Sequence, residues 1–333
     1  MTLFPKILAK QRKMTDKKIL ITDYVHDLLI EKLKSHGYDF DYMPDITLPG
    51  VKSVIKRYCA VVINTKTRMD KEMLKLADSL KLIVRLGSGL DIVDLDYAAE
   101  KGIVVERTPE ANSNAVAEHA MAMLLALMTN LVTANREVRK MQWNREKNRG
   151  VELQGKTVGI IGFGHTGSAF AEKLRSFGVK ILVYDKYKQR FAADIRYIQE
   201  SNMKMIFEHS DILSLHIPLT GETEKMVNRR FLNKFNKNII FINTSRGKIV
   251  KTEDLLDALN SGKVKGAALD VLENEKIDSY TQEEKEMYGE LFSKPNVIVT
   301  PHIAGWTAES KKKIASSAFE KIEKHCFRSY GER

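Results

Sequence analysis

The sequence of 333 residues has little cysteine and no long hydrophobic run. Its two cysteines, Cys59 and Cys326, are too few for a disulfide framework, which favours a reducing compartment. The longest apolar stretch, Ala120 to Met128, is far shorter than the roughly 18 residues that a membrane-spanning helix needs. With 43% hydrophobic and 29% charged residues, the composition is that of a soluble globular protein. We therefore expect a cytoplasmic protein that does not bind a membrane.

The basic stretch 1–13 also lacks the apolar core and small-residue cleavage site of a secretory signal. The sequence predicts that this stretch is an extension outside the folded part. The first predicted strand begins only at about Lys18, so Met14 is an alternative start of the natural protein.

Positive charge is in excess, with a formal net charge of +11 at pH 7. The lysines are spread along the whole chain and no nucleic-acid-binding motif is present, so a nucleic-acid partner is not expected. The excess has two interpretations. It is either an ordinary solvated surface or a surface that attracts an anionic cofactor and an acidic substrate.

Three glycines at G-x-G-x-x-G spacing stand in the middle of the chain. An apolar run from Val158 leads into Gly162, Gly164 and Gly167, and a helical pattern follows. The first glycine allows a tight turn, the second lets the backbone approach a phosphate, and the third lets the helix pack against the strand. The start of the helix offers N–H groups to an anion. The pattern predicts a dinucleotide-binding turn.

A second strand pattern, 180–184, ends in Asp185, which lies 18 residues after the last glycine. An acid at about this distance is the expected acceptor for the ribose 2′-hydroxyl. Because a carboxylate repels a 2′-phosphate, NAD is favoured over NADP, although Lys186 and Lys188 lie nearby.

Short apolar runs alternate with helical patterns, which predicts βαβ units and parallel sheets. The length favours two domains, and prolines at 109 and 301 mark two crossings between them. We predict a doubly wound Rossmann-type NAD-binding domain, residues 109–302, inserted into a smaller flavodoxin-like α/β substrate domain made of residues 1–108 and 303–333. The strands predicted before residue 109 are 19–22, 60–63, 82–86 and 103–106, with helices near 25–36, 70–79 and 94–101.

One long helix is predicted from Ser113 to about Trp143. Its stretch from Val116 to Met128 is apolar on nearly every side, so it should be buried, partly in a subunit interface.

Arg246, Glu275 and His302 each follow a buried strand pattern, so we expect them at the sheet edge beside the glycine turn. Arginine binds a carboxylate with two hydrogen bonds and can polarise a carbonyl. Histidine moves protons near neutral pH, and a carboxylate beside it orients the ring and raises its pKa. Singly, each residue has a structural explanation, as an ion pair, a surface acid or a core histidine. Together they predict hydride transfer to a 2-keto acid, with the hydride carried by a nicotinamide.

From about Lys18 onward the sequence resembles the D-isomer-specific 2-hydroxyacid dehydrogenase family. The resemblance is carried by the glycine turn with Asp185, His216-Ile-Pro-Leu-Thr220, Asn243-Thr-Ser-Arg-Gly247, Ala268-Leu-Asp-Val-Leu-Glu-Asn-Glu275 and Thr300-Pro-His-Ile-Ala-Gly305. It implies a dehydrogenase in which Arg246 binds the substrate carboxylate and carbonyl, His302 is the acid/base and Glu275 is its partner.

The resemblance also implies the ligand contacts and the assembly. Cofactor contacts are implied for Gly162, Gly164, His165, Thr166, Gly167, Asp185, His216, Pro218, Thr244, Asp270 and Gly305. Among these, Asp270 would accept from the nicotinamide carboxamide. The segment Gly87-Ser88-Gly89 follows a predicted strand and would offer N–H groups to the substrate carboxylate. No metal is expected, and a homodimer would form through the helix near 113–140.

Within the family, Gly162-Phe-Gly-His165 and Trp143-Asn-Arg145 are similar to phosphoglycerate dehydrogenases. There, a basic residue at the Trp-Asn lies near the substrate phosphate of the neighbouring subunit. Asn64-Thr65 departs from the usual Arg-Ser pair, so Lys66 or Arg68 would bind the phosphate instead. The predicted reaction is oxidation of 3-phosphoglycerate in serine synthesis, and the alternative is reduction of glyoxylate or hydroxypyruvate.

The sequence departs from the family pattern at two further positions, and three other functions are compared with the predicted one. Lys276 stands where the family often has proline, so the loop of Glu275 is expected to differ, and Thr166 replaces an apolar residue. Glu275 rather than glutamine argues against formate oxidation. Phosphite oxidation uses a similar set of residues, so the sequence does not distinguish it from the oxidation of a 2-hydroxy acid. An NAD(H)-sensing scaffold protein is the alternative from another class.

Overall fold

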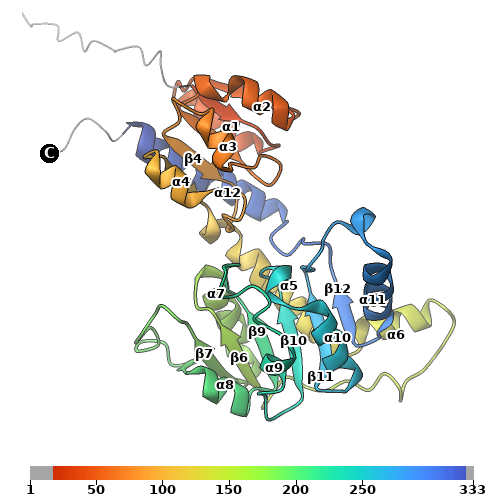
Figure 1. Ribbon diagram of the computed structural model, residues 1–333. Coiled ribbons are helices and arrows are strands. Elements are labelled where there is room, and N and C mark those ends of the chain that lie inside the picture. Colours follow the sequence, from red (N-terminus) through yellow and green to blue (C-terminus); the bar gives the residue numbers. More distant parts are fainter. Residues whose placement is uncertain (1–17, 328–333) are drawn as a thin grey trace, which may run out of the picture. The chain divides into compact units, whose positions relative to one another are not determined.

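The computed structural model describes residues 18–327 (Figure 1). The chain forms two compact units: one comprises the chain up to Thr108 and again from Lys312, and the other is Pro109–Lys311. The predicted extension at 1–13, the alternative start at Met14 and the side chain of Cys326 lie outside the described residues.

The first unit is built on a five-stranded parallel sheet with the order β2-β1-β3-β4-β5. This is the strand order of flavodoxin-like folds, so the predicted fold class of this part is confirmed. The strands are β1 Ile19–Ile21, β2 Phe40–Tyr42, β3 Ala60–Ile63, β4 Leu82–Arg85 and β5 Val104–Arg107. The helices are α1 Asp27–Ser35, α2 Leu48–Val54, α3 Lys71–Lys75, α4 Leu95–Glu100 and the later part of α12, Ala308–Phe327, with a 3-10 turn at Ile55–Arg57.

Alternate residues of the strands bury against helices on opposite faces of this sheet, because successive side chains of a strand point to opposite sides. Ile19 and Ile21 pack with residues of α1 and α12, whereas Leu20 packs with residues of α2, α3 and α4. Each such side chain contributes about 1.5–3 kcal/mol by leaving water. Both faces are therefore closed, as parallel sheets require.

The second unit contains a seven-stranded parallel sheet with the order β12-β11-β10-β9-β6-β7-β8, which is the doubly wound Rossmann arrangement. Its strands are β6 Thr157–Ile161, β7 Lys180–Tyr184, β8 Gln199–Glu200, β9 Ile212–Leu215, β10 Ile239–Asn243, β11 Val264–Leu269 and β12 Val297–Val299. Its helices are α5 Pro109–Met128, α6 Leu131–Val138, α7 His165–Leu174, α8 Met203–His209, α9 Arg229–Leu232, α10 Thr252–Asn260 and α11 Gln282–Ser293, with 3-10 turns at Arg175–Phe177, Gly247–Ile249 and Ile277–Ser279.

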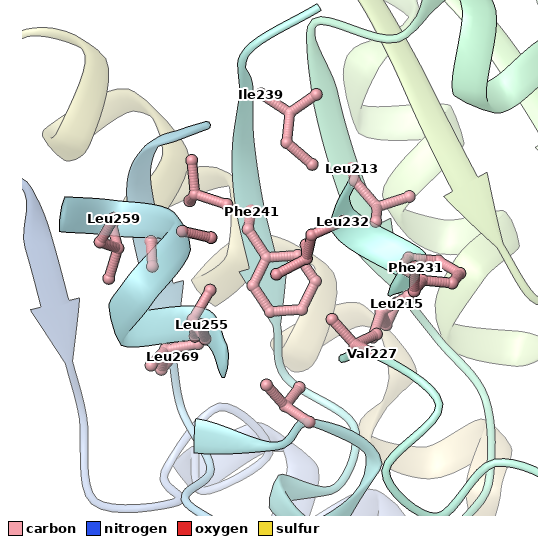
Figure 2. Packing of buried hydrophobic residues seen from close by; sticks show 14 of the residues in the cluster. Leu213, Leu215, Val227, Phe231, Leu232, Ile239, Phe241, Leu255, Leu259 and Leu269 are labelled. Atoms are coloured by element: carbon pink, nitrogen blue, oxygen red, sulfur yellow. The ribbon is translucent and has the colours of Figure 1, made fainter. Parts of the chain in front are cut away.

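Two apolar layers hold the helices onto this sheet. On one face, Leu213, Phe241 and Leu269 pack with residues of α9 and α10 (Figure 2). On the other face, residues of α5 and α7 cover β6 and β7. The sheet is thus buried on both sides, and its strand ends are held in fixed register.

The prediction of one long helix from 113 to about 143 is wrong, because the structure has two helices here, and the second, α6, ends at Val138. The helix breaks at Asn130, which adopts the left-handed conformation with φ 54°, and α5 and α6 are bent by 63°. Asparagine tolerates this conformation better than most residues, and its side-chain amide donates to the Arg149 carbonyl at 3.2 Å. The predicted burial of Val116–Met128 is confirmed on most of its positions.

Across residues 18–327, no single helix has the length and apolar composition of a membrane span; α5 and α6 pass that test only when joined across their bend.

The chain returns from the second unit to the first at Lys312, within α12. The sequence predicts this return between residues 302 and 303. Hydrogen bonds explain the difference. The N–H groups of Ile303 and Ala304 donate to the carboxylate of Asp270, and the Ser310 hydroxyl donates to the Gly305 carbonyl. Residues 303–304 are therefore tied to the end of β11, and the start of α12 is bound to the residue that follows them.

A carboxylate fastens α12 to the first sheet. Glu106 of β5 accepts from His325 at 2.6 Å and Lys324 at 3.2 Å, and lies 3.7 Å from Lys321, with only 17% of its side chain exposed. Burial alone would raise the pKa of Glu106, but the hydrogen bonds from His325 and Lys324 and the charges of Lys321 and Lys324 together outweigh burial, so its pKa lies below the ordinary value.

Because its folded-state pKa is depressed, Glu106 stabilises the protein above the unfolded-state pKa and loses that contribution as pH falls through the folded-state pKa. We expect Glu106→Gln to lower the free energy of unfolding by about 1–2 kcal/mol at pH 7, and by much less near pH 3. Urea unfolding at both pH values measures this, with Glu100→Gln on the exposed side of α4 as the control. An equal loss at both pH values would contradict the electrostatic explanation.

Candidate active site

Five neighbouring strands of the seven-stranded sheet end on the edge where the predicted site residues lie. The glycine turn follows β6, His216 follows β9, Arg246 follows β10, Glu275 follows β11 and His302 follows β12. The strand order reverses between β6 and β9, and ligands of open α/β sheets bind at the carboxyl ends of strands at such a point.

The three glycines of the turn meet different steric demands. Gly162 has φ +95°, and a Cβ there would overlap the His216 carbonyl oxygen. A Cβ at Gly167 would overlap the Gly162 carbonyl oxygen, so this glycine lets α7 approach β6. A Cβ at Gly164 would meet no atom within 4 Å. The middle glycine is therefore not required by the packing of the turn itself, and it leaves room for a ligand.

The surroundings of this turn fit a dinucleotide. Gly164 is the N-cap of α7 and provides no side-chain capping bond, so the first N–H groups of the helix remain for an anion. Within the described residues, the buried atoms His216 Nδ1 and Thr244 Oγ1 have no hydrogen-bond partner. Burial lowers the pKa of His216 to about 3, so its ring is neutral at pH 7. Buried polar atoms without a hydrogen-bond partner are expected where a bound polar ligand supplies the missing hydrogen bond.

Asp185 is held firmly at the end of β7. Its Oδ2 accepts from the N–H of Phe163 at 2.7 Å, and its Oδ1 accepts from the N–H groups of Tyr187 at 2.9 Å and Lys188 at 3.1 Å. The Lys188 ammonium donates to the Phe163 carbonyl at 2.6 Å. The acid expected at the ribose is thus joined to the glycine turn through Phe163.

His302 and Glu275 are brought together. His302 Nδ1 lies 3.0 Å from Glu275 Oε2, and both side chains are nearly half exposed, at 47% and 45%. An ionised carboxylate only accepts, so Nδ1 carries the proton in this pair and Nε2 is left for another partner. This is the arrangement of a histidine whose tautomer and ring direction are set by an acid.

His302 has φ +55°, which is uncommon for a residue other than glycine. Its N–H donates to the Asp270 carbonyl at 2.8 Å. The Asp270 carboxylate, 1% exposed, accepts from Thr300 Oγ1 at 2.5 Å, Ile303 N at 2.9 Å and Ala304 N at 2.8 Å. Asp270 therefore shapes the loop that carries His302. Its expected contact with a carboxamide remains a prediction.

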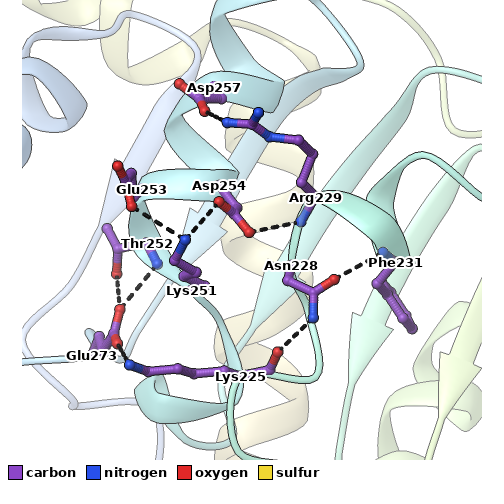
Figure 3. A network of polar contacts seen from close by, with 10 residues as sticks. All are labelled: Lys225, Asn228, Arg229, Phe231, Lys251, Thr252, Glu253, Asp254, Asp257 and Glu273. Atoms are coloured by element: carbon purple, nitrogen blue, oxygen red, sulfur yellow. Dashed lines mark hydrogen bonds and ion pairs between the residues drawn. The ribbon is translucent and has the colours of Figure 1, made fainter.

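The loop of Glu275 is anchored on both sides of that residue. Glu273 accepts from the N–H and the hydroxyl of Thr252, both at 3.0 Å, and pairs with Lys225 at 3.4 Å (Figure 3). The Asn274 N–H donates to the Tyr288 hydroxyl at 3.1 Å. The Lys276 N–H donates to Asn274 Oδ1 at 3.0 Å, a bond that a proline at 276 could not make. The departure at 276 thus has a structural consequence.

Arg246 is half-buried just after β10, in extended backbone with φ −144°. Its guanidinium donates to the Ser245 carbonyl at 2.6 Å, and its carbonyl accepts from the Asn243 side chain at 3.0 Å. The asparagine also accepts from Ser245, which fixes the turn. Arg246 follows β10 and His302 follows β12, with β11 between these two strands, so both residues lie on one edge of the sheet.

A groove of about 570 Å³ lies beside the acid–base pair. Its walls include His302 and Glu275, the edge strand residue Val297, Phe292 of α11 and Val132 of α6. The groove is mainly apolar, and it continues the candidate site toward α6.

The remaining predicted cofactor contacts occupy the same edge. His165 is exposed and Thr166 half-buried in the first turn of α7. The Pro218 carbonyl accepts from the Thr223 hydroxyl at 2.7 Å. A Cβ at Gly305 would press on the Asn112 side chain.

The predicted substrate contacts lie mostly in the first unit. The Gly87 N–H donates to Thr108 Oγ1 at 2.8 Å, and the Ser88 carbonyl accepts from Arg107 at 3.0 Å, so the turn that contains Gly87, Ser88 and Gly89 is bound to the end of β5 and the residue after it. Lys66 is exposed after β3 and donates to the Pro44 carbonyl. Arg145 is exposed in a turn of the second unit.

Sequence reasoning missed His119 and Thr300. His119 Nε2 of α5 lies 2.9 Å from Thr300 Oγ1 and 3.6 Å from Asp270 Oδ1. The available signal was the pair Glu118-His119, which interrupts the apolar run of α5.

Comparison with known proteins identifies the family of this chain. Residues 121–304 match the model of the D-isomer specific 2-hydroxyacid dehydrogenase, NAD binding domain. The chain is 36% identical over 271 residues to hydroxypyruvate reductase of Thermotoga maritima, covering 81% of this chain and 86% of that protein. It is 32% identical over 308 residues to D-3-phosphoglycerate dehydrogenase of Methanocaldococcus jannaschii, covering 92% of this chain and 57% of the relative. The chain thus spans little more than half the length of that relative.

A solved structure agrees in fold. The D-lactate dehydrogenase of Aquifex aeolicus, complexed with NAD and lactic acid, has a TM-score of 0.80 and 29% identity, covering 92% of this chain and 95% of that chain. The chain belongs to the D-isomer-specific 2-hydroxyacid dehydrogenase family, and it carries that family's NAD-binding domain.

Two glycine substitutions separate packing from ligand space. We expect Gly164→Ala to leave the thermal midpoint nearly unchanged but to weaken NADH binding about tenfold or more, because the methyl group enters the space for the pyrophosphate. Gly167→Ala should destabilise the fold by about 1–3 kcal/mol, because its Cβ meets backbone. Thermal unfolding and NADH fluorescence titration measure both effects. Wild-type NADH affinity in Gly164→Ala would contradict this placement of the cofactor.

Proposed function

We propose that the protein is an NAD-dependent oxidoreductase that transfers a hydride between nicotinamide and a D-2-hydroxy acid or 2-keto acid. The observation that carries the proposal is the 3.0 Å pair of His302 and Glu275, at the same sheet edge as the glycine turn. The two-cysteine composition supports a reducing compartment, and we place the reaction in the cytoplasm.

The bound nicotinamide supplies or accepts the hydride. Arg246 binds the substrate carboxylate and polarises the carbonyl, a role for which a planar cation is suited. In the direction of reduction, His302 gives the proton from Nε2 to the carbonyl oxygen as that oxygen gains negative charge. Glu275 keeps the ring aligned through Nδ1 and stabilises the imidazolium before the transfer. In the direction of oxidation, the same nitrogen takes the hydroxyl proton.

NAD is the proposed cofactor rather than NADP. The Asp185 carboxylate is fixed by three backbone N–H groups at the place where the ribose is expected, and its charge opposes a 2′-phosphate.

For the substrate we propose 3-phosphoglycerate, oxidised to 3-phosphohydroxypyruvate in serine synthesis. The support is the net charge of +11, the segment Trp143-Asn-Arg145 and the similarity to a phosphoglycerate dehydrogenase. Lys66 stands at the carboxyl edge of the first sheet, on the same edge as Gly87, Ser88 and Gly89, and is proposed to contact the phosphate. Reduction of glyoxylate or hydroxypyruvate is the competing assignment, because a hydroxypyruvate reductase is also among the similar proteins.

The test is NADH consumption with 3-phosphohydroxypyruvate, hydroxypyruvate, glyoxylate and pyruvate. We expect the phosphorylated acid to give the highest kcat/KM. His302→Ala should lower kcat by about 10²–10⁴-fold, because general acid–base catalysis is lost. Arg246→Ala should raise KM as well as lower kcat, because the cation acts on ground state and transition state.

Matched controls are available for both substitutions. His209 at the end of α8 has the same exposed fraction as His302, 47%, and Arg230 of α9 is exposed. Their alanine variants should retain full activity. Turnover of only the unphosphorylated acids would overturn the substrate assignment. NADH binding without turnover of any 2-keto acid would overturn the dehydrogenase and favour an NAD(H)-sensing scaffold.

We also propose a homodimer formed through the region predicted at 113–140. Most of α5 is buried within its own unit, so α6 and the turn after it would supply the contacts. There Leu131 and Val132 are more than half exposed, Met141 is 96% exposed and Trp143 is 83% exposed. We propose that these exposed apolar side chains form the interaction site. The groove beside α6 offers an apolar surface for a second copy.

Trp143→Glu combined with Val132→Glu should dissociate the dimer at micromolar concentration without unfolding it, because both side chains are exposed. Sedimentation equilibrium measures the mass. Leu76→Glu, an exposed apolar position of the first unit, is the control and should remain dimeric. A wild-type protein that sediments as a monomer at the same concentration would refute the proposal.

A further inference from the structure

His119 is a polar residue on a helix that otherwise buries apolar side chains. It lies on α5, with 22% of its side chain exposed, and its ring reaches the loop after β12. Nε2 is 2.9 Å from Thr300 Oγ1 and 3.6 Å from Asp270 Oδ1. His119 is more than 150 positions from both Thr300 and Asp270 in the sequence, so these contacts are a product of the fold.

The protons of this group can be assigned by elimination. The Thr300 hydroxyl has one proton and donates it to Asp270 Oδ1 at 2.5 Å. The bond between Thr300 Oγ1 and His119 must therefore use a proton of the histidine, so His119 carries one on Nε2. The result is a directed series in which His119 donates to Thr300 and Thr300 donates to Asp270.

The series ends on the carboxylate that shapes the His302 loop. Asp270 also accepts from Ile303 and Ala304, and its carbonyl accepts from the N–H of His302. His302 has a left-handed backbone, which persists in a residue other than glycine only where surrounding contacts impose it. The direction of the His302 ring toward Glu275 depends on that backbone.

We propose that His119 is a positioning residue for His302, acting through Thr300 and Asp270; this inference rests on the proposed function of His302 as the acid/base. Thr300 has an alternative acceptor, because its Oγ1 is 3.8 Å from the sulfur of Met123. When His119 Nε2 donates to the Thr300 hydroxyl oxygen, it occupies one lone pair of that oxygen. The hydroxyl proton of Thr300 then stays directed at the Asp270 carboxylate. Without that donor, the hydroxyl can turn to the sulfur, and Asp270 loses one of the bonds that hold the loop.

The experiment compares His119→Leu, which removes the donor, with His119→Gln, whose amide can still donate to Thr300. Thr300→Val removes the middle member of the series. Steady-state kinetics give kcat and KM, and NADH fluorescence gives the cofactor Kd. The ¹⁵N spectrum of the imidazole rings of the cofactor-free protein reports the His302 environment, with His302→Asn used for assignment.

We expect His119→Leu and Thr300→Val to lower kcat about 10–100-fold, with the KM for the keto acid and the NADH Kd changed about twofold or less, because a small displacement of a catalytic group acts on kcat. His119→Gln should recover to within about threefold of the wild type. The His302 resonances should move in His119→Leu and not in His119→Gln. His209→Leu, on the surface at the end of α8, is the control and should leave kcat unchanged.

Three results would overturn the inference: an unchanged kcat in His119→Leu, a loss explained by weaker NADH binding, or equal defects in the leucine and glutamine variants. Failure of the proposed function is a separate result. In that case the wild type has no turnover, and the ¹⁵N spectra alone decide whether His119 sets the environment of His302.

Discussion

The buried carboxylate of Asp270 is the interaction on which the candidate site depends most directly. A charge removed from water is costly unless hydrogen bonds replace the lost hydration, and here two backbone N–H groups and a hydroxyl do so. The same bonds draw residues 303–304 onto the end of β11 and give His302 its unusual backbone. One carboxylate thus sets the boundary of the second unit and the orientation of its acid–base histidine.

The parallel sheet supplies the second constraint, because it fixes which residues become neighbours. β10, β11 and β12 are adjacent, so the loops with Arg246, Glu275 and His302 leave one edge side by side. Helices α10 and α11 support these loops, because Thr252 of α10 donates to Glu273 and the Tyr288 hydroxyl of α11 accepts from Asn274. The exposed pair of Glu275 and His302 is therefore supported by buried neighbours that take no part in the chemistry. That division explains how two side chains in contact with water keep one geometry.

Much of this could be predicted from the sequence, and what could not has physical causes. Strands 60–63 and 180–184 were predicted correctly, since short apolar runs rich in β-branched residues carry a strong local signal. β2 was missed because its residues Phe40–Tyr42 form a half-exposed edge with an aspartate inside it. The break at Asn130 depends on one left-handed residue that the helical pattern does not reveal. The series from His119 to Asp270 joins three elements, and no local pattern contains such information.

Asp185 has a consequence for the engineering of cofactor preference. An exchange of NAD for NADP would ordinarily begin by replacing this acid with a small neutral residue. Here, the carboxylate also accepts from the backbone N–H of Phe163, which lies between the first two glycines of the turn, and from two further backbone N–H groups. Without this carboxylate, three backbone N–H groups would have only water as their acceptor. The turn predicted to bind the pyrophosphate would then be less rigid. A redesign at position 185 therefore has to remove the negative charge and still provide a hydrogen-bond acceptor for these backbone N–H groups. A single substitution to alanine provides no acceptor.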